Sequence, residues 1–203
     1  MTASRSKATI FTVGHSTMEI AALLSVLKQH RIEAVADVRS SPYSQHNPQF
    51  NRETLQASLR EAGIQYVFLG DEFGARRSEP DCYVTGQALY ERIAKTSAFQ
   101  HGLQRLVQGA ARMRIALLCA EKDPLECHRA ILICRHLKSA VPSITHILSD
   151  GSLESHEQME ERLLQQFNLV GEDLFQSKAE RLDAAYEQQG KRIAYKEEMV
   201  LQP

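Results

Sequence analysis

Short apolar runs alternate with amphipathic segments along most of this chain, and this alternation constrains its fold more than any other feature. Five runs have the length of buried strands: residues 9–13, 32–38, 64–69, 115–118 and 144–148. Helical patterns follow them, over about 16–30, 52–62, 87–108, 125–137 and 155–167, and a break is expected in the third near Thr96. This order predicts an α/β fold, with a mostly parallel, Rossmann-like sheet of about five strands and helices on both faces.

The pattern predicts a single α/β domain over residues 9–170. A chain of 203 residues with 43% hydrophobic residues is long and apolar enough for one such core. Residues 1–8 are polar and are predicted to form a flexible N-terminus. Residues 171–203 are rich in Glu, Gln, Lys and Arg, and are predicted to form a polar tail that is weakly docked, partly helical or disordered.

Charge and hydropathy exclude some classes of protein. The formal net charge of −1 argues against a strongly basic nucleic-acid binder. No apolar run approaches the roughly 18 residues of a membrane span, and the first residues lack the apolar stretch of a secretory signal. We therefore expect no membrane contact and a cytoplasmic location, where the four cysteines would be free thiols.

Polar side chains follow the end of each predicted strand. Because the carboxyl ends of parallel strands meet at one edge of a sheet, these side chains should gather there, where α/β proteins usually bind ligands. They lie at 15–16, 37–39, 70–71, 119–121 and 149–150.

The densest group of reactive side chains lies at 119–129. Asp123 and Pro124 have the pattern of an N-cap followed by the first helical residue. Around this predicted helix start lie two thiols, a carboxylate, an imidazole and a guanidinium: Cys119, Glu121, Cys127, His128 and Arg129. A thiol here would become a nucleophile if its thiolate were stabilised, and Arg129 would bind an anion. The alternative is structural, with buried thiols and an ion-paired arginine.

Two other groups are candidates for the same site. His15 would act as a general acid or base, whereas Ser16 has Glu19 three residues later and so is also a candidate N-cap. Asp37 and Arg39 lie on the same side of an extended chain, so they would either pair with each other or leave Arg39 to bind an anion together with Arg129.

Two loops are candidates for ligand contact. In the loop at 40–50, Tyr43, His46 and Phe50 would stack on a base or sugar, or simply pack the loop. The polar loop at 70–86 contains Arg76 and Arg77, which would add positive charge to the site or remain solvated.

Three ordered motifs resemble a known family. They are Thr-x-Gly-His-Ser at 12–16, Asp-Val-Arg-x-x-Pro-x-Ser-x-x-Asn-Pro-x-Phe at 37–50 and Cys-Ala-Glu-x-x-Pro-x-x-Cys-His-Arg at 119–129. Over about residues 9–150 the chain resembles the "domain of unknown function 488" family. The resemblance implies a bacterial-type cytosolic α/β protein without an established activity. It also implies that nine of the motif residues form one site, namely His15, Asp37, Arg39, Asn47, Cys119, Glu121, Cys127, His128 and Arg129.

Three functional hypotheses follow. In the first, the chain binds or processes a phosphate-bearing ligand, such as a nucleotide or a nucleic-acid end. Arg39 and Arg129 would hold the anion, and His15 or His128 would move a proton, oriented by Glu121 or Asp37. In the second, Cys119, Cys127 and His128 bind zinc or iron, with His15 or Asp37 as further ligands. In the third, the loops at 43–50 and 70–86 form a nucleic-acid or protein interaction module. The sequence does not specify a cofactor or an oligomeric state.

Overall fold

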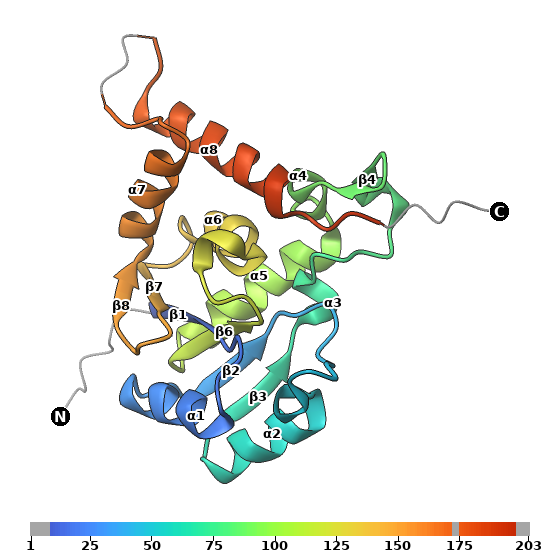
Figure 1. Ribbon diagram of the computed structural model, residues 1–203, viewed down its shortest axis with the longest axis vertical. Helices are drawn as coiled ribbons and strands as arrows, with labels where there is room; N and C mark the ends of the chain where they lie inside the picture. Colours follow the sequence, from blue (N-terminus) through green and yellow to red (C-terminus); the bar gives the residue numbers. More distant parts are fainter. Residues whose placement is uncertain (1–8, 172–174, 198–203) are drawn as a thin grey trace.

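The computed structural model describes residues 9–171 and 175–197, so the N-terminus predicted at 1–8 lies outside the described residues. Its centre is a six-stranded sheet in the order β3-β2-β6-β1-β7-β8 (Figure 1). The first five strands in this order are parallel, and β8 joins the β7 edge antiparallel. The strands are β1 (Thr9–Gly14), β2 (Ala34–Asp37), β3 (Gln65–Phe68), β6 (Ile115–Cys119), β7 (Ser143–Ile147) and β8 (Leu153–Ser155). The predicted α/β fold with a mostly parallel sheet is confirmed.

Helices cover both faces of the sheet, as the alternating pattern predicts. On one face, α1 (Ile20–Gln29) and α2 (Arg52–Glu61) pack leucines against apolar side chains of β1, β2 and β6. On the other face lie α3 (Gly70–Phe73), α5 (Ser97–Ala110) and α6 (Arg135–Leu137). The two cores together bury the central strands. The polar groups at the carboxyl ends of these strands therefore lie at the edge of the core, next to solvent.

Several predicted helix boundaries are wrong, and tertiary hydrogen bonds explain why. Ser16 is not an N-cap: α1 begins at Ile20, and Ser16 adopts a left-handed backbone with φ 46° while its N–H donates to the Ala120 carbonyl. The predicted helix at 87–108 is a short strand and two helices, β5 (Gln87–Ala88), α4 (Tyr90–Ile93) and α5, with the expected break at Thr96.

The loop predicted at 70–86 is largely structured. It contains α3, a 3₁₀ turn η2 (Pro80–Cys82) and β4 (Tyr83–Val84), which pairs antiparallel with β5. A further 3₁₀ turn, η1 (Pro48–Phe50), ends the other candidate loop. The strand β8 is also additional: its last residue, Ser155, caps α7 (His156–Gln166) in a capping box with Gln158.

The C-terminal segment packs more firmly than its polar composition predicts. The helix α8 (Lys178–Ile193) buries Leu182, Ala185 and Tyr186 against α7 and the segment at 125–131. These few apolar residues recur on one helical face, so a mostly polar sequence still forms a docked helix. Within the described residues, no helix is long and apolar enough to cross a membrane.

Candidate functional site

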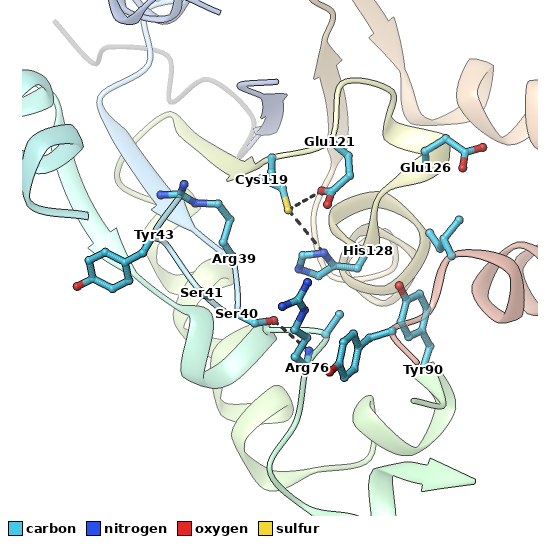
Figure 2. A pocket seen from close by; sticks show the side chains of 14 residues that line it. Arg39, Ser40, Ser41, Tyr43, Arg76, Tyr90, Cys119, Glu121, Glu126 and His128 are labelled. Carbon is cyan, nitrogen blue, oxygen red and sulfur yellow. Dashed lines mark hydrogen bonds between the residues drawn. The ribbon is translucent and has the colours of Figure 1, made fainter. Parts of the chain in front are cut away.

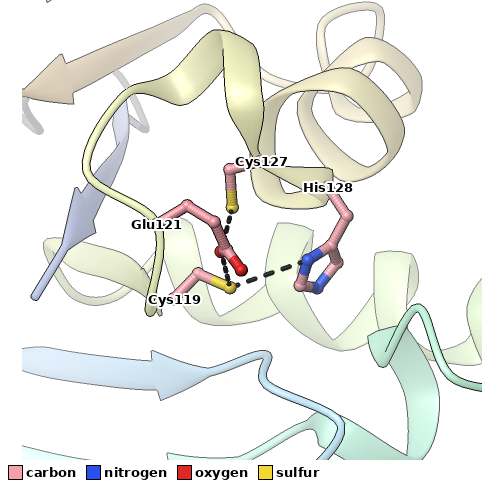
Figure 3. Close-up of side chains that lie close together, drawn as sticks. All are labelled: Cys119, Glu121, Cys127 and His128. Atoms are coloured by element: carbon pink, nitrogen blue, oxygen red, sulfur yellow. Dashed lines mark hydrogen bonds between the residues drawn. The ribbon is translucent and has the colours of Figure 1, made fainter. Parts of the chain in front are cut away.

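Two thiols, a carboxylate and an imidazole meet at the carboxyl end of β6. They belong to Cys119, Glu121, Cys127 and His128, and one ligand atom from each lies within 4.8 Å of all the others (Figure 3). Cys119 is the last residue of β6, and Glu121 is in the turn that follows. The cluster therefore joins the strand end to the segment that carries Cys127 and His128.

An interruption in the helix brings Cys127 and His128 to face the strand end. The predicted helix at 125–137 is instead a 3₁₀ turn, η3 (Pro124–Glu126), followed by a π-helix, η4 (Arg129–Cys134). Asp123 caps η3 as predicted, since its side chain accepts from the Leu125 N–H. Between the two, Cys127 is extended, with φ −136° and ψ 135°. The chain therefore changes course at Cys127, and the side chains of Cys127 and His128 both reach the cluster.

Hydrogen bonds connect the four side chains. Glu121 Oε2 accepts from the thiols of Cys119 at 2.9 Å and Cys127 at 3.0 Å. His128 Nδ1 lies 3.6 Å from Cys119 Sγ. On the opposite side of its ring, His128 Nε2 donates to the Val38 carbonyl at 3.0 Å. That bond fixes the ring and directs Nδ1 into the cluster.

The electrostatics of the cluster differ between its two thiols. Burial raises the pKa of the Cys119 thiol, and burial also raises the pKa of Glu121. Burial opposes ionisation of Cys127 too, but the hydrogen bond from Cys119 and the charge of Arg129 hold its pKa well below the usual range. The two thiols therefore differ in how readily they lose a proton.

Arg129 holds the turn after β6 in place. It is fully buried, and its Nη1 and Nη2 donate to the carbonyls of Glu121 at 2.6 Å and Lys122 at 3.1 Å. Its Nε donates to Thr12 Oγ1 at 3.4 Å. Each nitrogen of the guanidinium thus has a partner within the protein. Arg129 acts on the cluster by fixing the turn and by its charge.

A chain of buried hydrogen bonds continues from Thr12 to the C-terminal helix. Thr12 Oγ1 lies 2.8 Å from His146 Nδ1, and His146 Nε2 lies 3.0 Å from His156 Nδ1. His156 Nε2 lies 3.0 Å from the Tyr186 hydroxyl, which donates to Glu160 at 2.8 Å. Since the arginine at one end only donates and the carboxylate at the other end only accepts, every bond in the chain runs in the same direction.

Asp37 and Arg39 pair with each other, as one of the two sequence interpretations predicts. Arg39 donates from Nε and Nη2 to the two oxygens of Asp37, at 2.9 Å and 2.6 Å. Its Nη1 lies 3.3 Å from His15 Nε2, while His15 Nδ1 lies 2.9 Å from the Ser16 carbonyl. His15 is buried and stacks on Phe50, and burial lowers its pKa to about 4. This histidine is neutral near pH 7, with both ring nitrogens engaged.

A pocket of about 400 Å³ opens beside the cluster (Figure 2). Three members of the cluster line it, namely Cys119, Glu121 and His128. Its other walls include Arg39, Arg76, Tyr90 and Tyr195. Figure 2 shows the guanidinium of Arg39 directed away from His128 and that of Arg76 directed toward it. The pocket thus connects one open side of the cluster to solvent.

The other sequence candidates lie further out. Tyr43 lines the pocket at its rim, where it is exposed and donates to Glu53. Ser16, His46 and Asn47 do not line the pocket. The backbone N–H groups of His46 and Asn47 both contact Ser44 Oγ, an arrangement that holds the loop.

Sequence reasoning missed several residues around the site. Thr12, His146 and His156 had no role in the predicted site, although buried polar residues inside apolar strands are a signal that a partner exists. Tyr195 was assigned to the tail, and Tyr90 to a helix. No local pattern places these two in one pocket, because they come from segments more than a hundred residues apart.

Comparison with known proteins gives one match. A family model described as "Domain of unknown function DUF488" matches residues 19–135. This range contains the second and third motifs of the sequence and all four cluster residues, and it is narrower than the resemblance over about 9–150. No curated protein and no solved structure matches the chain.

Proposed function

Because the chain belongs to the DUF488 family, whose description names no activity, we infer the function from the site. We propose that the protein binds a zinc or ferrous ion through Cys119, Glu121, Cys127 and His128. The observation that carries this proposal is the orientation of His128. Its Nε2 is engaged by the Val38 carbonyl, which leaves Nδ1 facing both the thiol and the carboxylate. Histidine ligands of metals usually have such an outer partner.

The distances in the cluster suit a tetrahedral ion. Metal–sulfur bonds near 2.3 Å and metal–nitrogen bonds near 2.0 Å place tetrahedral donors about 3.3–3.8 Å apart. The donor atoms here lie within 4.8 Å of one another, and Cys119 Sγ is 3.6 Å from His128 Nδ1. Small rotations of side chains would therefore close the site. Thiolate and imidazole donors favour zinc or iron over the harder calcium and magnesium ions.

The two thiols fit metal binding better than nucleophilic catalysis. Cys127 has the lowered pKa, but it is buried and does not line the pocket. Cys119 lines the pocket, but burial raises its pKa. A nucleophile must be both ionised and accessible, and neither thiol combines the two properties. A metal ion would use both, because it displaces the thiol protons when it binds.

A second candidate function is binding of a phosphate-bearing ligand, which the presence of Arg76 in the wall of the pocket favours. The sequence predicts that Arg39 and Arg129 hold the anion. In the structure the donors of Arg39 contact Asp37, His15 and the Phe50 carbonyl, and those of Arg129 contact Thr12 and two carbonyls. An anion at this pocket would need another partner. The interaction module at 43–50 and 70–86 remains a prediction from sequence alone.

Elemental analysis of the full-length protein, purified under reducing conditions, tests the metal proposal. We expect about one zinc or iron per chain, and loss of the metal from Cys119→Ser, Cys127→Ser and His128→Gln. Titration with cobalt(II) gives an independent readout, because thiolate coordination produces a charge-transfer absorption.

The other two cysteines provide matched controls. Cys82 and Cys134 are equally buried but lie outside the cluster, so Cys82→Ala and Cys134→Ala should retain the metal and the cobalt spectrum. Metal content far below one per chain after reconstitution, or the same content in all five variants, would contradict the proposal.

A further inference from the structure

Within the part of the chain that the structure describes, the pocket beside the cluster has one cation without a counter-ion. Arg39 is neutralised by Asp37, and Glu126 lies 3.8 Å from Arg192. If the cluster holds a divalent ion, the two thiolates and Glu121 contribute three negative charges. The ion and the buried Arg129 contribute three positive charges, so the net charge of the loaded cluster is zero. Among the residues that the structure describes, Arg76 forms no ion pair. The metal-loaded pocket therefore has a net charge of one positive unit, and this charge belongs to Arg76.

Arg76 is held in position by contacts that, among the described residues, leave its side-chain donors free. Its guanidinium carbon lies 4.8 Å from the centroid of the Tyr195 ring, a cation–π arrangement. Its backbone N–H donates to Ser40 Oγ at 3.0 Å. Stacking occupies the face of a guanidinium but not its edge, where the N–H groups match an oxyanion in a fork. In Figure 2 the guanidinium points toward His128, within the pocket.

The C-terminal segment builds the wall on which Arg76 stacks. The Tyr195 carbonyl accepts from the Ala88 N–H at 2.9 Å, and Lys196 forms an isolated bridge with Gln87. These bonds tie the residues after α8 to the β4–β5 hairpin. These contacts hold the backbone of Tyr195, whose ring is the stacking partner of Arg76.

We propose that this pocket binds a small molecule carrying one oxyanion group, a carboxylate or a phosphate. Arg76 holds this group through its guanidinium edge, while another part of the molecule reaches the open side of the metal centre. The inference rests on the proposed metal site, because without the ion the cluster carries negative charge. The volume of about 400 Å³ is near the lower end for small-molecule sites, so the ligand is of metabolite size.

Calorimetric titration of the zinc-loaded full-length protein with inorganic phosphate and, separately, with acetate tests this inference. We expect at least one of them to bind, and Arg76→Ala to weaken that binding by about tenfold or more, because a charge-assisted pair is lost. Arg76→Lys should give an intermediate affinity, since it retains the charge without the fork. The probe that binds identifies the oxyanion.

The exposed Arg112 provides a control of equal charge change, and Arg112→Ala should leave the affinity unchanged. The zinc content of every sample is measured before titration. Two results would overturn the oxyanion site and leave the metal site standing. In the first, zinc-loaded wild-type protein binds neither probe; in the second, zinc-loaded Arg76→Ala binds the probes as tightly as the wild type. Protein that fails to load zinc or iron would overturn both.

Discussion

His146 Nε2 lies 3.0 Å from His156 Nδ1 in a buried pair that requires both imidazoles to be neutral. Thr12 donates to one ring and the other donates to Tyr186, so each histidine gives one proton and accepts one. Protonation of either would place two donors face to face in the buried interior. Burial accordingly lowers the pKa of His146 well below its usual range and that of His156 to about 4.

This pair makes the stability of the protein depend on pH. The folded-state pKa values lie below the unfolded value near 6.5, so the stabilisation is complete above pH 6.5 and is lost as pH falls toward 4. In that window the free energy of unfolding should fall by about 1.4 kcal/mol per pH unit for each such histidine. Urea unfolding at pH 7 and pH 5 measures the difference, and His156→Gln should reduce it. If the difference between pH 7 and pH 5 is the same in His156→Gln as in the wild type, other groups cause the pH dependence.

Removal of one hydroxyl should show how firmly α8 is joined to this chain of bonds. Tyr186→Phe retains the packed ring but removes the hydroxyl that contacts His156 and donates to Glu160. We expect a loss of about 1–3 kcal/mol in the free energy of unfolding. Tyr43→Phe removes an exposed hydroxyl that also contacts a glutamate, Glu53, and should change stability by less than about 0.5 kcal/mol. Equal effects of the two variants would contradict a buried structural role for Tyr186.

Breaking the Asp37–Arg39 pair should be costly because both groups are buried. Asp37→Asn leaves the guanidinium of Arg39 with an uncompensated charge and weakens the acceptor of the Tyr66 hydroxyl. We expect a destabilisation of about 3–5 kcal/mol in denaturant unfolding. The exposed Asp183, which pairs with Arg135, is the control, and Asp183→Asn should cost less than about 1 kcal/mol. A small effect of Asp37→Asn would mean that water reaches Arg39.

Gly14 is required because the chain after β6 approaches it closely. A Cβ atom at Gly14 would lie 1.8 Å from the Glu121 carbonyl oxygen, a backbone atom that Arg129 also holds. Gly14→Ala should therefore displace the turn, with reduced metal content and a destabilisation above about 2 kcal/mol. At Gly109 a Cβ meets only the end of the Ile115 side chain. Gly109→Ala should be close to neutral, and wild-type metal content in Gly14→Ala would show that the turn adapts.

The sequence by itself determined the α/β architecture, because the periods of apolar residues are local and strands and helices follow from them directly. It also determined the centre of the candidate site. Cys119, Glu121, Cys127 and His128 lie within ten positions of one another and follow a predicted strand, so their proximity required little beyond the local chain. Asp123 as a cap and the break at Thr96 were predictable for the same reason.

Only the tertiary structure decided which partner each polar group takes. The sequence left Arg39 free either to pair or to bind an anion, and the choice depends on how β2 places it beside Asp37 and the Phe50 carbonyl. The extended residue at Cys127 interrupts a helix that the local pattern predicts to be continuous.

The direction of His128 Nδ1 depends on the Val38 carbonyl, ninety residues away in the chain. Tyr195 reaches the pocket because α8 docks through a few apolar residues in a polar segment. Hydrogen bonds between distant segments have no periodic trace in the sequence, because their geometry exists only once the sheet has brought the strand ends together. For this reason the four central residues of the site could be predicted from the sequence, but their roles and the residues around them could not.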